Sequence, residues 1–166
     1  QRGVGTSSNG AGAFGASINV QTDGLIPNAY AEISSGYGSF NTWKNTVKAG
    51  SGLLANNWAF DARLSKITSD GFIDRASSNL KSFFVSAGRY GKKSIFKVNV
   101  FSGMEKTYQA WNGISEEMLK AGNRTYNKFT YANQTDNYQQ DYYQMFYTYH
   151  FNKHLKAHVG VHYTYG

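Results

Sequence analysis

The stretch that decides the fold reads YQMFYTYHFNKHLKAHVGVHYTY and covers residues 143–165. On both sides of residues 152–154, apolar or aromatic side chains alternate with polar ones. A period of two is typical of β-strands with one apolar and one polar face. A three-residue turn at 152–154 pairs Phe151 with Leu155, and paired residues share a face of a sheet. The stretch therefore predicts an antiparallel hairpin whose two apolar sides coincide. The further expected pairs are Tyr149 with Ala157 and Tyr147 with Val159.

Similar alternation, weakest in the first segment, recurs along most of the chain. The expected strands cover residues 30–40, 43–53, 58–64, 81–90, 94–102, 138–151 and 155–165. The composition agrees with a β-rich fold. The chain contains 13 Tyr, 11 Phe and 3 Trp but only one Pro, and aromatic residues favour strands. Mean hydropathy is nevertheless negative, which suits a sheet with one apolar face and one wet face. We predict an all-β fold, an antiparallel meander of about seven strands.

The lengths of the links between these strands carry a second signal. Tight links are expected at residues 54–57, 91–93 and 152–154, and long links at 65–79 and 103–137. Short and long links alternate along the later strands, as they do in outer-membrane barrels, whereas the link at 38–41 is short and departs from the pattern. Strands of about ten residues cross a bilayer when tilted. Because bacterial single-chain barrels have an even number of strands, seven strands predict a segment of a larger transmembrane β-barrel.

A glycine-rich stretch near the start of the chain raises a different possibility. Residues 10–15, Gly-Ala-Gly-Ala-Phe-Gly, match the dinucleotide-binding pattern G-x-G-x-x-G. That pattern needs a buried strand before it and a helix after it. Only one aliphatic residue, Val4, precedes the glycines, and a short alternating run, residues 16–22, follows them. We therefore expect a turn that leads into a short strand, not a nucleotide site.

The residues from Arg2 to Thr22 resemble the closing segment of the plug domain of TonB-dependent outer-membrane receptors. The family often has Gly-Gly-x-Ile-Asn in this segment, and here Ala16 replaces the second Gly. Four later stretches resemble barrel segments of the iron-siderophore type, in versions common in Bacteroidetes. They are residues 37–42, 69–75, 106–113 and 161–166. The resemblance implies that residues 1–24 are the C-terminal end of a plug domain and residues 25–166 the N-terminal strands of an incomplete outer-membrane β-barrel.

The same resemblance implies a function. Such receptors lie in the bacterial outer membrane, in contact with its lipid, and take up a scarce ligand with energy supplied by a TonB-type protein of the inner membrane. The implied cargo is an iron-siderophore complex or a similar small ligand, with no catalysis and no cofactor. The region that would contact the energy-transducing partner is expected outside this chain.

The long link at residues 103–137 is the candidate ligand-binding segment, because long loops often carry function. Its residues suited to ligand contact are Tyr108, Trp111, Asn112 and Arg124. The alternative is that these side chains pack the loop or belong to an interfacial aromatic belt. Residues 115–122 predict a short helix within the link, with Ser115 as the N-cap and Gly122 as the C-cap.

Several other functional classes find little support. His150, His154, His158 and His162 follow one another at intervals of four and would form a metal-binding ladder on a helix. On a strand, His158 and His162 lie about 13 Å apart at ~3.3 Å per residue, too far to share one ion. The net charge of +7 is scattered and indicates a solvated surface, not a nucleic-acid interface. No G-x-S-x-G motif or converging carboxylate pair indicates an enzyme.

Two further alternatives remain open from the sequence. One is a complete small barrel or adhesin-like membrane protein, against which the odd number of strands counts. The other is a soluble β-domain that binds carbohydrate or another ligand through its aromatic residues, against which the sorted link lengths count.

Overall fold

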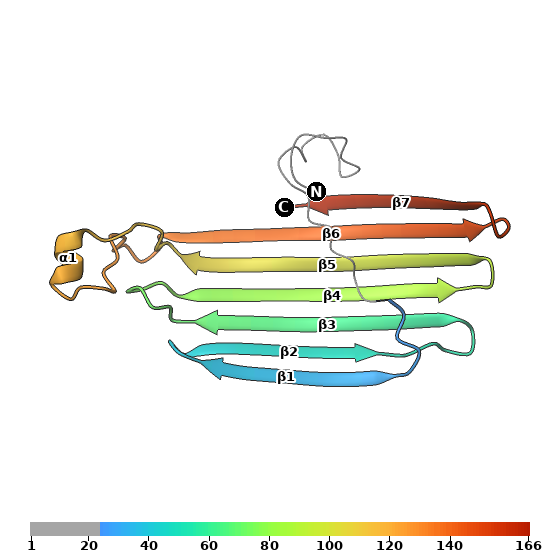
Figure 1. Cartoon of the computed structure of the whole chain (residues 1–166), viewed down its shortest axis with the longest axis horizontal. Helices are drawn as coiled ribbons and strands as arrows, with labels where there is room; N and C mark the ends of the chain where they lie inside the picture. Colours follow the sequence, from blue (N-terminus) through green and yellow to red (C-terminus); the bar gives the residue numbers. More distant parts are fainter. Residues whose placement is uncertain (1–23) are drawn as a thin grey trace.

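The computed structural model describes residues 24–166, which fold as a seven-stranded antiparallel sheet with the order β1-β2-β3-β4-β5-β6-β7 (Figure 1). Every strand pairs with its neighbour in the sequence, so the predicted all-β meander is confirmed. The plug segment predicted at residues 1–24, with its glycine-rich turn and short strand, lies outside the described residues except for Gly24. The strands are β1 (Tyr30–Gly38), β2 (Thr42–Gly50), β3 (Trp58–Ser69), β4 (Ser78–Tyr90), β5 (Ser94–Tyr108), β6 (Thr135–His150) and β7 (Lys156–Tyr165).

The central strands are longer than the alternation predicts. β3 continues to Ser69 and β5 to Tyr108, while β4 begins at Ser78 and β6 at Thr135. The expected long links at 65–79 and 103–137 were therefore too long at both ends. Polar side chains stand on both faces of these strand ends, so the period of two disappears from the sequence. The backbone ladder does not depend on that contrast and continues between the strands.

The register places the apolar sides of all seven strands on one face of the sheet. The pairs Tyr149–Ala157 and Tyr147–Val159 of β6 and β7 form as predicted. One continuous row across this face, called here the apolar face, consists of Ala31, Ala49, Ala62, Val85, Val100, Tyr143 and Tyr163. The opposite side is called the polar face. One row across it consists of Gly50, Asp61, Ser86, Asn99, Gln144 and His162.

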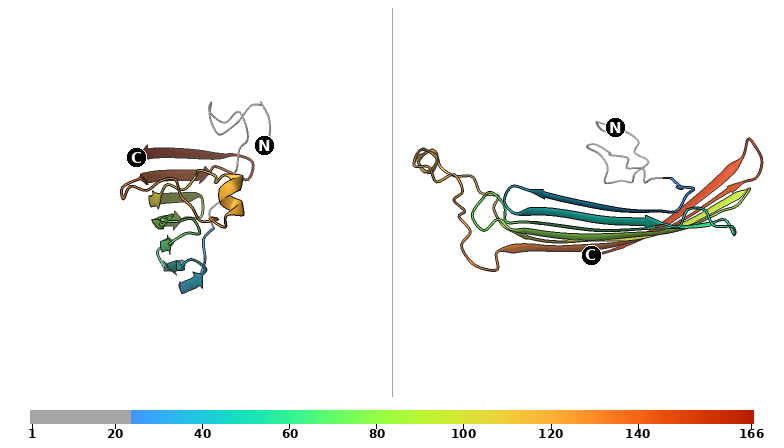
Figure 2. Two further views of the ribbon diagram at one scale, coloured as in Figure 1. Left: turned by 90° about the vertical axis from the view of Figure 1, so that its left-hand side faces the viewer. Right: turned by 90° about the horizontal axis from the view of Figure 1, so that it is seen from below.

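The described part of the chain has almost no apolar core. Within it only Ala59 and Tyr108 are buried hydrophobic residues, whereas Ile33 on the apolar face is 80% exposed. The sheet is twisted and curved (Figure 2). Its polar face is the more sheltered side, since Ser86 in β4 is buried while its neighbour Val85 on the apolar face is exposed. The fold thus departs from the usual arrangement, because polar residues at the centre of the polar face, such as Ser86 and Asn99, are buried while the apolar face is exposed.

The links gather at the two ends of the sheet, and the longest of them lies at one end (Figure 1). The links 51–57, 91–93 and 151–155 lie together at one end, called here the turn end. The links 39–41, 70–77 and 109–134 lie at the other, called here the loop end. Short and long links alternate as predicted along the later strands, at 91–93, 109–134 and 151–155, with the short link 39–41 as the exception. The tight link predicted at 54–57 is wrong in its bounds, because β2 ends at Gly50 and the link 51–57 is nearly as long as the link 70–77.

The longest link contains the predicted helix. The helix α1 (Glu116–Lys120) begins after Ser115, whose side chain accepts a hydrogen bond from the Met118 amide at 3.3 Å. The C-cap is Ala121, and Gly122 follows it with a φ of 82°, the left-handed conformation that ends many helices. In residues 24–166, no helix has both the length and the apolar character needed to cross a membrane.

Candidate functional site

The loop end is organised by an arginine in the link between β3 and β4. Arg75 Nε donates to the Phe129 carbonyl at 3.0 Å, and Arg75 Nη2 donates to the carbonyls of Asn127 and Phe129, each at 2.9 Å. Hydrogen bonds from a charged donor are about twice as strong as neutral ones. Arg75 therefore connects the 70–77 link to residues 127–129 of the 109–134 link.

Asn127 completes this connection from the opposite side. The residue is buried, with 3% of its surface exposed. Its side-chain Nδ2 donates to the carbonyls of Asp74 and Gln109, at 2.9 and 3.0 Å. Its Oδ1 accepts from the Phe129 amide at 3.0 Å. The Asp74 amide in turn donates to the Thr125 carbonyl at 2.7 Å. Buried backbone groups need hydrogen-bond partners. The single buried side-chain amide of Asn127 supplies such partners to backbone groups of both irregular links.

Tyr108 does not lie in a loop, contrary to its predicted place. It is the last residue of β5 and is 6% exposed. Its hydroxyl donates to the Tyr131 carbonyl at 2.7 Å. The structure therefore gives this tyrosine a supporting position beneath the 109–134 link.

The other three predicted contact residues lie within the 109–134 link. Trp111 is 74% exposed, and its ring lies 5.5 Å from that of Phe129. Asn112 is half-buried and Arg124 is exposed. No hydrogen bond, ion pair or ring contact joins any two of the four predicted residues, so the structure does not gather them into one cluster.

Tyr131, at 76% exposure, is a further exposed aromatic residue of this link. Its backbone is held by two hydrogen bonds: its amide donates to Gln134 Oε1 at 2.9 Å, and its carbonyl accepts from the Tyr108 hydroxyl. Trp111 and Tyr131 therefore present open aromatic faces on a backbone that several hydrogen bonds hold in place.

The polar face carries a hollow of about 400 Å³ near the loop end. Its aromatic and polar lining includes Tyr138, Gln140 and Tyr142 of β6. The hydroxyls of Tyr138 and Tyr142 both donate to Gln140 Oε1. Sequence reasoning missed these residues because it read segment 138–151 for its apolar side. The signal was the even-numbered tyrosines, which place aromatic rings on the polar face, where Tyr142 stacks on Phe101 of β5.

Arg75 and Asn127 were also missed, and no sequence signal marks them. Both residues lie in irregular segments and are 52 residues apart in the sequence. In such segments neither the alternation of side chains nor a motif spacing indicates which residues will meet. Only the arrangement of the links brings them together.

Towards the turn end, the polar face is crossed by a hydrogen-bonded row. Ser86 Oγ donates to Asn99 Oδ1 at 2.9 Å, and Asn99 Nδ2 donates to Gln144 Oε1 at 3.3 Å. At the edge of the sheet, Lys48 pairs with Glu32 at 3.5 Å. Polar groups on this side of the sheet therefore have partners across three strands, β4 to β6, and across β1 and β2.

The histidines do not form a helical ladder, so that alternative is wrong. His150 ends β6, His154 lies in the turn, and His158 and His162 stand on the polar face of β7. His158 Nδ1 lies 2.8 Å from Thr148 Oγ1, its cross-strand partner. Among residues 24–166 no three His, Cys, Asp or Glu side chains gather as metal ligands.

Comparisons of the chain with protein-family models, curated proteins and solved structures find no match. Its function is therefore inferred from the faces of the sheet, the loop end and the sequence resemblance.

Proposed function

We propose that this chain forms part of the wall of a β-barrel in the bacterial outer membrane, within a receptor that imports a scarce ligand. The observation that carries the proposal is the bare apolar face, which continues across all seven strands. Soluble monomers rarely leave contiguous apolar patches of more than a few hundred Å² uncovered. Lipid covers such a face in a barrel, whose closed ladder also satisfies every backbone group.

The link lengths support an orientation in the membrane. Outer-membrane barrels have short periplasmic turns and longer extracellular loops. On this proposal the turn end faces the periplasm and the loop end faces the exterior. The strands have 9 to 16 residues, and about 9–11 are enough to cross a bilayer at a tilt.

The polar face suits the interior of a plugged barrel. Interiors of such barrels are polar, and lumen-facing residues alternate with lipid-facing ones. The row Ser86–Asn99–Gln144 and the hollow beside Tyr138 and Gln140 both belong to this face. In the whole receptor these groups would meet the plug, whose final segment is residues 1–24 by resemblance.

The proposed cargo is an iron-siderophore complex, a class suggested by the resemblance to TonB-dependent receptors. Exposed aromatic rings at the loop end, those of Trp111 and Tyr131, suit a ligand with a large unsaturated surface. Import needs an inner-membrane partner that acts on the plug, because the outer membrane holds no potential of its own. The contact region for that partner is proposed to lie outside this chain.

The membrane placement can be tested with single cysteines in β7, because the 166 residues contain no native Cys. The variants are Val161→Cys, His162→Cys and Tyr163→Cys, each labelled with a fluorophore in the protein reconstituted into vesicles. Brominated acyl chains should quench positions 161 and 163 and spare position 162, which lies on the opposite face. Equal quenching at all three positions, or none, would overturn the proposal.

The cargo requires a separate assay in cells that carry the whole protein. Double substitution of Trp111 and Tyr131 by alanine should lower uptake of ⁵⁵Fe-siderophore several-fold, whereas Asn123→Ala, an exposed change in the same link, should not. Uptake that is unaffected in the double variant would refute loop-end binding. A protein that stays soluble without detergent and binds oligosaccharide through these rings would instead support the carbohydrate-binding alternative.

A further inference from the structure

Two lysines interrupt the loop-end side of the apolar face. Lys66 of β3 and Lys81 of β4 are direct cross-strand partners, and both are exposed. Like charges directly opposite each other destabilise a sheet. Neither lysine belongs to an ion pair within residues 24–166, where the ion pairs are Lys48–Glu32 and Lys120–Glu116. This pair therefore lacks the counter-charge that would offset its repulsion.

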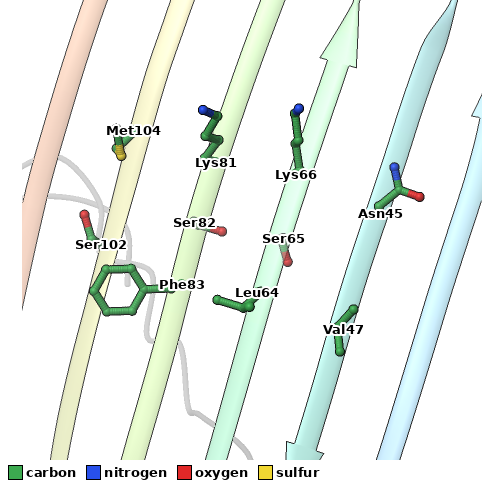
Figure 3. A pocket seen from close by; sticks show the side chains of 10 residues that line it. All are labelled: Asn45, Val47, Leu64, Ser65, Lys66, Lys81, Ser82, Phe83, Ser102 and Met104. Carbon is green, nitrogen blue, oxygen red and sulfur yellow. The ribbon is translucent and has the colours of Figure 1, made fainter.

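The lysines stand at the head of an apolar depression of about 380 Å³ (Figure 3). One row below them on the same face lie Val47, Leu64 and Phe83, which pair in register across β2, β3 and β4. Both ammonium groups point towards the loop end, away from Leu64 and Phe83 (Figure 3). The surface thus has two positive charges at one end and a continuous apolar floor at the other.

A third lysine extends the positive charge towards the loop end. Lys106 of β5 lies on the same face, diagonally from Lys81, which pairs with Met104. Diagonal neighbours on one face lie about 7–8 Å apart, within reach of long side chains. Three ammonium groups therefore follow one another along the boundary between the apolar rows and the loop end.

We propose that Lys66 and Lys81 bind the phosphate of a membrane lipid from the leaflet that surrounds the loop end. One acyl chain would then lie along Val47, Leu64 and Phe83. The charge pattern selects this occupant, because only an amphiphile with an anionic head matches both ends of the depression. The inference rests on the proposed function, since it needs the apolar face to contact lipid.

The test uses single-cysteine probes at Met104, which lines the depression, and at Val161, which lies on β7 away from it. Each variant carries a fluorophore and is reconstituted into phosphatidylcholine vesicles with a minor fraction of phosphatidylglycerol. In separate samples, either the phosphatidylcholine or the phosphatidylglycerol carries brominated acyl chains. The ratio of quenching by the two brominated lipids gives the relative association constant of the anionic lipid at each probe.

Each lysine near an anionic lipid contributes about fivefold to association. We expect the relative association constant at position 104 to exceed that at position 161 by on the order of tenfold at low salt. The double variant K66Q/K81Q should remove most of this difference, because only Lys106 then remains at this boundary. The matched control K44Q/K97Q removes two positive charges from the polar face and should retain it.

Equal association constants at the two probes, or an equal loss in K44Q/K97Q, would overturn the lipid site and leave the proposed function standing. Absence of quenching at 104 with quenching at 161 would mean that protein, such as a second copy of the chain, covers the depression, which also overturns the proposal. Absence of quenching by either lipid at both probes would instead refute the proposed membrane placement itself.

Discussion

Replacing Asn127 by alanine tests whether one buried amide holds the loop end together. The change removes three hydrogen bonds, to the carbonyls of Asp74 and Gln109 and from the Phe129 amide. At about 1 kcal/mol for each bond, the docked link loses about 3 kcal/mol. That loss corresponds to a roughly 100-fold increase in the population of the open link.

Hydrogen exchange at the Asp74 amide measures this opening without depending on Asn127 itself. That amide donates to the Thr125 carbonyl, so it is exposed only when the two links separate. We expect its exchange rate to rise by about two orders of magnitude in N127A. Amides in the centre of β4 and β5 should keep their protection, which shows that the sheet remains folded.

Two further variants control the interpretation. N127D keeps one acceptor oxygen for the Phe129 amide but loses the Nδ2 donor, so the Asp74 amide should again exchange faster. N123A alters an exposed asparagine of the same link and should leave the rate unchanged. Unchanged exchange of the Asp74 amide in N127A, or an equal rise in N123A, would refute the reasoning.

Three other predictions concern separate parts of the molecule. Arg75→Lys loses the two-pronged contact with the 109–134 link and should accelerate proteolysis of that link, with Lys128→Gln as an exposed control. Ser115→Ala removes the N-cap of α1 and should cost the helix about 1 kcal/mol, seen as faster exchange of the Met118 amide. Val100→Arg on the apolar face should destabilise the protein in vesicles by about 2–4 kcal/mol in urea unfolding if it faces the bilayer midplane, and a neutral result would contradict lipid exposure.

The hairpin of β6 and β7 shows why part of this fold could be predicted. Its register follows from turn length and from the match between apolar sides, and both are local properties of residues 143–165. Tyr149 and Ala157 pair as expected for that reason. The strand ends at Ser69 and Tyr108 could not be predicted, because polar residues on both faces remove the period while the backbone ladder continues.

The residues of the candidate site could be predicted from the sequence only in part. Trp111 lies exposed in the long link as expected, but Tyr108 is buried beneath it. Burial at the end of a strand depends on which segment folds over it, here the backbone of Tyr131. No pattern in the neighbouring sequence carries that information.

The sequence by itself determined the all-β meander, the two faces of each strand and the unequal links, because these follow from side-chain periods and turn lengths over short distances. The tertiary structure alone decided which face is bare, how Arg75 and Asn127 join two links, and that Lys66 stands opposite Lys81. These features depend on contacts between segments distant in the chain, whose geometry is set by the register and curvature of the whole sheet.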